Sequence, residues 1–216
     1  MRITIVYDNN TLEAGLTADW GWSCFIETAQ RNILFDTGGN GKILLENLRF
    51  LNIDPVSVDD VVISHPDFDH IGGLSAFLNS NPDAVVHVPR SFRGIRYPNK
   101  VHHYKTPVQI YPGVFLTGEM GREQSMAVNS ANGLVLIIGC GHPGVGNIMD
   151  VISQFGKVYA VIGGLHGFDN FEVFKGVHLI CPAHCTKHKD DIKKMYPEKC
   201  IEGGVGRVIE FDGTRK

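Results

Sequence analysis

The chain has 216 residues, of which 43% are hydrophobic and 20% are charged, and its formal net charge is −3. This composition is ordinary for a globular protein, and the slightly negative charge argues against broad binding to nucleic acid or to a membrane surface. We therefore expect neither nucleic acid nor a membrane surface as a partner, and the sequence leaves the oligomeric state open.

Two absences bear on location and organisation. No stretch approaches the length of a transmembrane helix, and the apolar run within Met1–Asp8 is too short for a signal peptide. The five cysteines are scattered and odd in number, which indicates reduced thiols rather than a disulfide framework. We expect a cytoplasmic protein. Because no linker or repeat interrupts the chain, we also expect one domain over residues 1–216.

Apolar, β-branched runs that end in glycine-containing turns predict strands along the whole chain. In chain order these are Ile3–Tyr7, Ser23–Glu27, Asn32–Asp36, Asp60–Ile63, Ala84–Val88, Val114–Thr117, Gln124–Asn129, Leu134–Ile138, Val158–Ile162, Val177–Cys181 and Arg207–Phe211. Helices fit best at Lys42–Leu51, Leu74–Asn79, Val145–Phe155, Phe171–Phe174 and Lys187–Tyr196. Strands outnumber helices, and in the second half single strands alternate with helices. This order predicts a layered α/β protein with sheets inside and helices outside.

A dense group of metal-capable side chains follows the predicted strand Asp60–Ile63. From His65 to His70 the sequence reads His-Pro-Asp-Phe-Asp-His, and packing alone does not require such a group. Alternation along an extended segment points His65 and Asp67 the same way, and the next turn brings Asp69 and His70 towards a second centre. Imidazole nitrogens and carboxylate oxygens suit Zn, Mn or Fe. We interpret the segment as a metal site rather than as a polar turn after a buried strand.

Three further histidines stand just after predicted strands, at positions 142, 166 and 184. Active groups in α/β proteins gather at the carboxyl ends of strands, where loops converge on one crevice. We predict that His142 and His184 are metal ligands. For His166, metal binding competes with a catalytic role and with support of a ligand.

Taken together, these motifs resemble the metallo-β-lactamase fold superfamily. The similarity spans nearly the whole chain and is carried by Phe35-Asp36-Thr37-Gly38, His65–His70, His142 and His184. Three motifs further resemble a subgroup labelled 7,8-dihydropterin-6-methyl-4-(β-D-ribofuranosyl)-aminobenzene-5'-phosphate synthase-like: Gly139–His142, Val161–His166 and Pro182–Thr186. The superfamily hosts many reactions on one scaffold, so the resemblance is specific for the fold rather than for a substrate.

The resemblance implies a four-layer αββα sandwich of the α/β (α+β) class, with one or two divalent metal ions at an edge between the sheets. One metal would take His65, the residue at position 67 and His142, and the other would take Asp69, His70 and His184. Asp36 would steady the main metal-binding loop by hydrogen bonds.

The chain departs from the family pattern in two places. Position 67 is usually histidine, and Asp67 is a harder, negatively charged ligand that shifts the preference towards Fe or Mn. A carboxylate at this position also occurs in the flavodiiron branch of the superfamily. The segment between the third and last ligand motifs also lacks an evident bridging aspartate, and the nearest candidates for that role are Cys140, Asp169 and His166. We expect Cys140 to be a small buried thiol beside the metal site rather than a ligand.

Such a site supports hydrolysis by a metal-bound hydroxide. Asp69 could both bind metal and orient the attacking water, and His166 could protonate the leaving group or stabilise an oxyanion. The leading hypothesis is a metal-dependent hydrolase that acts on a small phosphorylated or otherwise anionic molecule. The alternatives are a di-iron redox protein, although no flavin or iron–sulfur segment is recognisable, and a non-catalytic metal-binding sensor.

Two segments bear on substrate binding. Arg90–Lys105 contains no acidic residue and interleaves cations with aromatic side chains, so Arg93 and Arg96 could bind a phosphate, although a solvated surface loop explains the same composition. Asp19–Trp22 holds two tryptophans that could form a pocket wall, against the commoner explanation that they are buried in the core.

Overall fold

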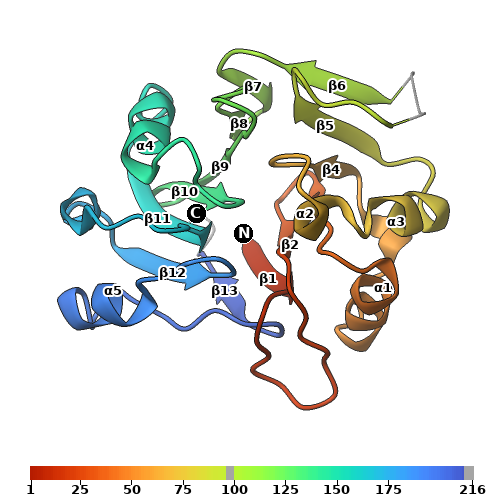
Figure 1. The fold of residues 1–216 in the computed structure, drawn as a ribbon. Helices are drawn as coiled ribbons and strands as arrows, with labels where there is room; N and C mark the ends of the chain where they lie inside the picture. Colours follow the sequence, from red (N-terminus) through yellow and green to blue (C-terminus); the bar gives the residue numbers. More distant parts are fainter. Residues whose placement is uncertain (96–99, 212–216) are drawn as a thin grey trace.

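The computed structural model describes residues 1–95 and 100–211, and its centre consists of two β-sheets (Figure 1). The first sheet has seven strands in the order β13-β1-β2-β3-β4-β5-β6. These strands are β1 (Arg2–Tyr7), β2 (Ser23–Glu27), β3 (Asn32–Phe35), β4 (Asp60–Val62), β5 (Val85–Pro89), β6 (Val101–Tyr104) and β13 (Val208–Glu210). From β3 to β6 the neighbouring strands are parallel, so their carboxyl ends share one edge.

The second sheet has six strands in the order β12-β11-β10-β9-β8-β7. These strands are β7 (Val108–Tyr111), β8 (Val114–Leu116), β9 (Met126–Ser130), β10 (Gly133–Ile138), β11 (Val158–Gly164) and β12 (Leu179–Ala183). The last three are parallel to one another, so their carboxyl ends also share an edge.

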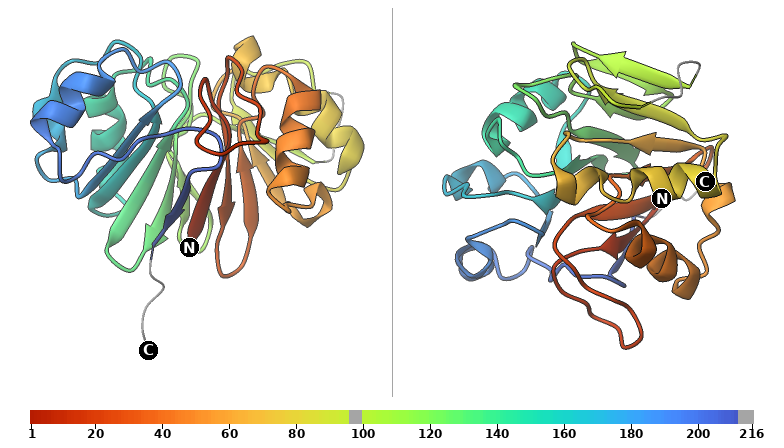
Figure 2. Two further views of the ribbon diagram at one scale, coloured as in Figure 1. Left: turned by 90° about the horizontal axis from the view of Figure 1, so that it is seen from below. Right: turned by 45° about the vertical axis from the view of Figure 1, so that its right-hand side comes forward.

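Helices cover the outer face of each sheet, so four layers are seen edge-on (Figure 2). The first sheet carries α1 (Gly41–Phe50), the single turn α2 (Phe68–Ile71) and α3 (Leu74–Ser80). The second sheet carries α4 (Val145–Ser153) and α5 (Lys189–Met195). Two short 3₁₀ segments complete the elements, η1 (Pro55–Ser57) and η2 (Phe171–Phe174). The arrangement confirms the predicted αββα sandwich.

Strand β10 explains why this sequence forms an internal layer. Val135 and Ile137 enter the core between the two sheets, whereas Leu134, Leu136 and Ile138 enter the core under α4. Side chains alternate between the faces of a strand, so a strand that is buried on both faces must be apolar throughout. An unbroken apolar run therefore specifies a strand covered by a second sheet on one side and by a helix on the other.

The helices and strands predicted from the sequence agree with the structure, but the sequence pattern does not predict some short or polar elements. β6 pairs in parallel with β5 inside the basic segment Arg90–Lys105, where the sequence pattern predicts no strand. His102 and His103 of β6 are exposed, so the segment lacks the apolar alternation that signals a strand. β7 and α2 were also not predicted. The single-domain organisation over residues 1–216 stays a prediction. Among the described residues, no helix is both long enough and apolar enough to cross a membrane.

Candidate metal centre

The predicted ligands come together where strands of the two sheets end. His65, Asp67, Asp69 and His70 follow β4 in the first sheet, whereas His142 follows β10 and His184 follows β12 in the second. The edge of the sandwich therefore collects side chains that are more than a hundred residues apart in the chain. Parallel strands produce this arrangement because their carboxyl ends lie at one edge.

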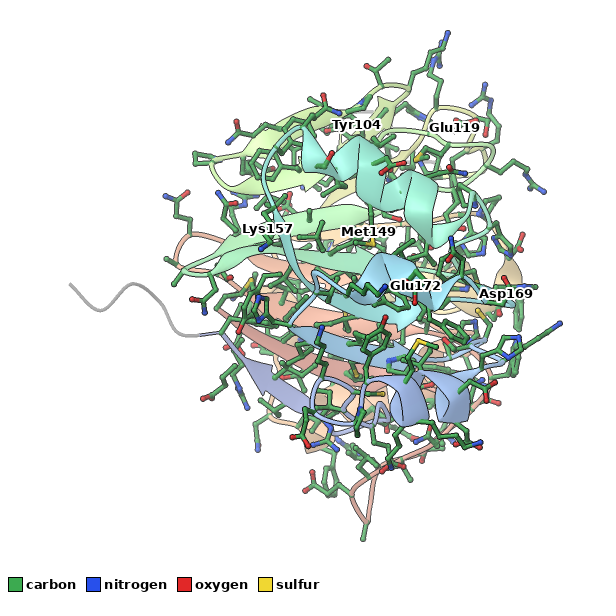
Figure 3. All side chains as sticks on the ribbon, turned by 90° about the vertical axis from the view of Figure 1, so that its left-hand side faces the viewer. Tyr104, Glu119, Met149, Lys157, Asp169 and Glu172 are labelled. Atoms are coloured by element: carbon green, nitrogen blue, oxygen red, sulfur yellow. The ribbon has the colours of Figure 1, made fainter. Side chains whose placement is uncertain are left out.

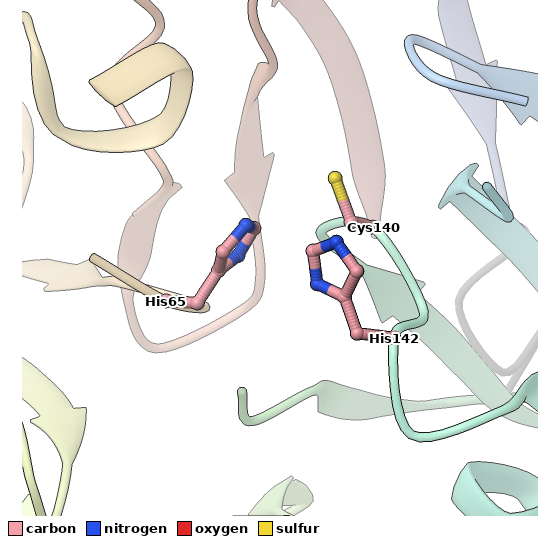
Figure 4. Close-up of side chains that lie close together, drawn as sticks. All are labelled: His65, Cys140 and His142. Atoms are coloured by element: carbon pink, nitrogen blue, oxygen red, sulfur yellow. The ribbon is translucent and has the colours of Figure 1, made fainter. Parts of the chain in front are cut away.

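The four imidazoles lie in two neighbouring pairs. The ring centroids of His65 and His142 are 5.0 Å apart, and those of His70 and His184 are also 5.0 Å apart. The rings of His65 and His70 are 4.0 Å apart, so the two pairs adjoin. In Figure 4 the imidazoles of His65 and His142 approach each other from opposite sides of the gap between two loops.

One carboxylate accompanies each pair. Oδ2 of Asp67 lies 3.5 Å from Nε2 of His65, and Oδ2 of Asp69 lies 3.2 Å from Nε2 of His184. Two ligand atoms on one tetrahedral zinc ion are about 3.3–3.7 Å apart. Both carboxylates are therefore at ligand spacing from an imidazole, in the two groups that the sequence predicts.

Each of the four histidines is oriented through its Nδ1 atom. Nδ1 of His70 lies 2.7 Å from Oδ2 of Asp36, and Nδ1 of His142 lies 3.0 Å from Oε2 of Glu123. Nδ1 of His184 lies 3.1 Å from Oδ1 of Asn9, and Nδ1 of His65 lies 2.8 Å from Oγ of Ser64, whose own hydrogen goes to Asp36. Because each partner accepts, each Nδ1 carries the hydrogen and each Nε2 presents a lone pair. This arrangement is typical of histidines that ligate a metal through Nε2.

The buried Nε2 atoms show that the site suits a cation. Nε2 of His65 and Nε2 of His184 are buried and have no hydrogen-bond partner among the described residues. Burial, followed by repulsion from neighbouring imidazoles, lowers the pKa of His65 to about 4 and that of His70 to about 3, so both are neutral at pH 7. A buried lone pair without a donor is costly, and a metal ion would satisfy it.

Glu123 supports the loop after β10, and sequence analysis missed it. Its carboxylate is buried and accepts the backbone N–H groups of Cys140, Gly141 and His142 at 3.0, 2.8 and 2.9 Å. Burial alone would raise the pKa of Glu123, but the hydrogen bond to His142 and these N–H groups hold it at about 2. The residue precedes β9 in a stretch without a local pattern, so no sequence signal distinguishes it.

Asp8 and Asn9 hold His184 in a similar way. Oδ1 of Asp8 accepts the backbone N–H of His184 at 2.9 Å, and Nδ2 of Asn9 donates to the carbonyl of His184 at 3.0 Å. Both residues follow β1 directly, at the same edge as the histidines. The strand-end rule that selected His142 and His184 would have found them.

Backbone strain is concentrated here. Only four non-glycine residues in the described ranges have positive φ, and three of them, Asp36 (56°), His166 (46°) and His184 (47°), belong to this edge. Such conformations persist only where the surroundings hold them, and they cluster at functional sites.

The remaining predicted residues lie around the ligand groups. Asp36 also accepts Ser64 N–H at 2.7 Å, which ties it to the main loop as expected from the family, and burial raises its pKa to about 7. His166 is exposed, with its ring 5.2 Å from that of His142. Cys140 is buried, and its Sγ lies 3.3 Å from Nε2 of His70. Asp169 is exposed beside η2 (Figure 3).

A pocket of about 290 Å³ opens beside the first ligand group. Its lining residues are His65, Asp67, Arg122, Glu123 and His142. Arg122, which sequence analysis missed, is the cation of this pocket. Arg93 lines a different pocket, beside α2 and α3, and its Nη1 donates to the carbonyls of Arg90 and Phe92. Arg96 lies outside the described residues, so the predicted phosphate-binding role of Arg93 and Arg96 stays a prediction.

The two tryptophans of Asp19–Trp22 have opposite environments. Trp22 is fully buried in the core between the sheets, whereas Trp20 is 58% exposed and its ring centroid is 5.1 Å from that of His184. Phe68, within the His65–His70 motif, is 73% exposed. The core explanation therefore holds for Trp22, and Trp20 forms a wall beside the ligands.

Comparison with known proteins identifies the family. A synthase of Methanocaldococcus jannaschii, 7,8-dihydropterin-6-methyl-4-(beta-D-ribofuranosyl)-aminobenzene-5'-phosphate synthase, is 25% identical over 84% of this chain and 85% of its own. The crystal structure of a metal-dependent hydrolase of the beta-lactamase superfamily has a TM-score of 0.79 at 25% identity, covering 98% of this chain and all of the other. A diphosphatase of the PhnP family shares the fold alone, with a TM-score of 0.62 at 12% identity over 98% of both chains. The family model described as the metallo-beta-lactamase superfamily matches residues 17–163. The chain therefore belongs to the metallo-β-lactamase superfamily.

Proposed function

We propose that this protein is a metal-dependent hydrolase that acts on a small anionic substrate, most simply a phosphate ester. One observation carries the proposal: four imidazole Nε2 atoms and two carboxylates converge beside a pocket that also contains an arginine. The hydrolase named in the structural comparison supports the reaction class, since it is similar over its full length.

We also propose a cytoplasmic location, supported by five cysteines that are all free.

Two groups of residues would hold the metals. The first is His65, Asp67 and His142, and the second is Asp69, His70 and His184. When bound, divalent ions act as Lewis acids that lower the pKa of water and offset charge on a phosphoryl oxygen. Nitrogen and carboxylate donors are compatible with Zn, Mn and Fe.

The protein's own groups would orient the reactants. Asp69 is half-buried with one oxygen directed at His184, and its second oxygen can accept a hydrogen bond from the attacking water. His166 stands at the exposed rim beside His142, and burial together with the neighbouring His142 imidazole lowers the pKa of His166. A neutral imidazole there can donate a hydrogen bond to the leaving group. Arg122 would bind the substrate anion.

The exposed aromatic residues favour a substrate with a ring. Trp20 presents a large part of its indole next to His184, and Phe68 is also open to solvent. Exposed aromatic side chains beside a polar site can stack with a planar group. We propose that the substrate carries an anionic group that faces Arg122 and a ring that faces Trp20.

A second candidate is a synthase reaction on a phosphorylated aromatic molecule. It is favoured by the activity for which the M. jannaschii relative is named, because the similarity covers 84% of this chain. A third candidate, di-iron redox chemistry, is favoured by Asp67. Metal analysis of protein purified without chelator separates this last candidate, since tightly held iron with a visible absorption band indicates redox chemistry and Zn or Mn indicates hydrolysis.

A substrate panel tests the proposal. Phosphomonoesters, phosphodiesters, thioesters and lactones, each with and without an aryl group, are incubated with the metal-loaded protein and with the His65→Ala variant. We expect release of phosphate or of a phosphomonoester, lost in His65→Ala and retained in the control His103→Ala, which changes an exposed histidine on β6. Turnover of no ester, or equal turnover by His65→Ala, would contradict a hydrolase at this site.

A further inference from the structure

The thiol of Cys140 lies between the two ligand groups. Its Sγ is within 4.8 Å of the nearest ligand atoms of His65 and His142, and equally of His70 and His184, so it belongs to both groups. Figure 4 shows Cys140 and His142 on one loop, facing His65. The 3.3 Å separation between Sγ and Nε2 of His70 is near the spacing of about 3.6 Å expected for sulfur and nitrogen on one tetrahedral zinc.

The backbone holds the thiol in this position. The N–H of Cys140 donates to Oε1 of Glu123 at 3.0 Å, and the residue before it, Gly139, passes so close to Ser64 that an added Cβ would lie 2.3 Å from its Oγ. The loop therefore cannot move away from the main metal-binding loop without losing these contacts. Cys140 is buried, so the packing of the surrounding residues fixes the position of its thiol.

The neighbouring strand leaves no place for a carboxylate. β11 ends at Gly164, and a Cβ there would lie 2.2 Å from the carbonyl oxygen of Gly139 and 2.9 Å from Sγ of Cys185. The side-chain space at this strand end is already occupied by the chain of Cys140 and by the Cys185 thiol. His166 and Asp169, the other candidates for a shared ligand, are both exposed.

We propose that Cys140 coordinates as a thiolate shared by two divalent metal ions, in the role of the bridging aspartate that this sequence lacks. The inference rests on the metal binding proposed above, although not on hydrolysis. Metal entry deprotonates a coordinating thiol, and the proton leaves to the buffer. A sulfur that would bond each of two ions at about 2.3 Å is compatible with the separation of about 3.5–4 Å that two-metal sites use.

Cys185 has a supporting place beside this ligand. Its Sγ lies 3.3 Å from Sγ of Cys140 and donates towards it. Cys185 lies beside Cys140 but is in neither of the two clusters that Cys140 forms with His65 and His142 and with His70 and His184. It is therefore the matched control.

Cobalt spectroscopy tests the assignment without any enzymatic readout. Chelator-stripped protein, kept reduced with a phosphine, is titrated with Co²⁺ while absorption and bound cobalt per chain are measured. We expect a near-ultraviolet thiolate-to-cobalt charge-transfer band in the wild type, lost in Cys140→Ser and retained in Cys185→Ser and in the remote Cys200→Ser. Loss of a residue that hydrogen-bonds to a metal ligand lowers metal affinity about 10–100-fold. Because Cys140→Ser removes a ligand itself, its affinity for cobalt should fall by at least this factor.

A second variant covers the case in which Cys140→Ser does not fold. Cys140→Asp replaces the thiolate by a carboxylate, and we expect it to bind two cobalt ions without the charge-transfer band. Two cobalt ions bound by the wild type without the band would overturn the thiolate assignment and leave the metal centre intact. A band that survives in Cys140→Ser would likewise overturn it. Absence of cobalt binding by the wild type would overturn both this inference and the proposed function.

Discussion

Oε2 of Glu123 accepts hydrogen bonds from both the backbone N–H and the Nδ1 of His142, at 2.9 and 3.0 Å. One carboxylate therefore sets both the position of the His142 backbone and the direction of its ring. Because the same carboxylate binds two preceding N–H groups, the loop after β10 is shaped around a buried anion. A carboxylate beneath a ligating histidine also makes its imidazole a better donor.

Removal of this anion should weaken both the fold and the metal site. In Glu123→Ala three backbone N–H groups lose their acceptor, two of them buried, and an unsatisfied buried group costs about 1–3 kcal/mol. We expect the free energy of unfolding to fall by about 3 kcal/mol and metal affinity to fall about 10–100-fold. Urea denaturation and metal titration measure the two effects. Glu198→Gln, at an exposed position, is the control, and a Glu123→Ala variant with wild-type metal affinity would contradict the role.

A methyl group at Gly164 should disturb the centre from the strand side. The added Cβ of Gly164→Ala would lie 2.2 Å from a backbone oxygen, so β10 and β11 must separate. We expect a loss of about 2 kcal/mol or more in unfolding free energy, together with weaker metal binding. Gly176→Ala is the matched control because its Cβ meets nothing within 4 Å. Equal stability of the two variants in urea would show that the strand end has room for a side chain.

Asp60 should make stability depend on pH far from the metal centre. Its buried carboxylate accepts from Arg31 Nε, His87 Nε2 and Tyr111 OH at 2.7, 2.9 and 2.8 Å. Burial raises the pKa of Asp60, but the three hydrogen bonds lower this pKa by more than burial raises it. The net shift of the Asp60 pKa is therefore downwards. A carboxylate with a depressed folded pKa stabilises the protein above its unfolded pKa of about 3.9 and loses that contribution as pH falls through the folded value.

The Asp60→Asn variant should therefore be less stable than the wild type at pH 7, and the difference should shrink below about pH 4. Urea denaturation at pH 7, 5, 4 and 3 measures this convergence. Asp83→Asn is the control, because Asp83 pairs with Lys100 at the exposed surface and should show no measurable change. Parallel stability curves for the wild type and Asp60→Asn down to pH 3 would rule out the titration of Asp60.

Arg122 and Arg93 offer a paired test of anion binding. Arg122 lines the pocket of the first ligand group, whereas Arg93 lines the neighbouring one. A charge-assisted hydrogen bond is worth about 1.5–3 kcal/mol, so Arg122→Ala should raise KM for an anionic ester about 10–100-fold. Arg93→Ala should raise KM less. Steady-state kinetics on both variants decide between the pockets, and the reverse order would place the anion beside α2 and α3.

Trp20 should matter only for substrates with a ring. Stacking is worth about 0.5–1.5 kcal/mol, so Trp20→Ala should raise KM for an aryl phosphate about 2–10-fold and leave KM for a small alkyl phosphate unchanged. Trp20→Phe should restore most of the loss. Phe50→Ala, which removes an exposed aromatic side chain at the end of α1, is the control. An equal effect of Trp20→Ala on both substrates would indicate a structural role instead.

The sequence alone predicted the layers of the fold and the side chains that gather at one edge of the sandwich. These side chains are His65, Asp67, Asp69, His70, His142 and His184. Unbroken apolar runs such as Leu134–Ile138 specify strands buried on both faces, since every side chain must then be apolar. Histidines and aspartates directly after such runs lie at one edge, because parallel strands deliver their carboxyl ends to the same side. These are local patterns with a simple geometric consequence, and the structure does bring His65, His142 and His184 together.

Tertiary structure alone decided which groups support and connect the ligands. Glu123 and Arg122 stand in a turn without a repeating pattern, and only the packing of that turn against the loop after β10 brings them to the pocket. The same holds for Cys140, whose place between two imidazole pairs depends on the distance between the sheets. β6 becomes a strand because β5 offers it hydrogen bonds, although its own residues show no apolar alternation. Contacts across the sandwich join residues that have no fixed spacing along the chain. A local sequence pattern therefore cannot predict these contacts.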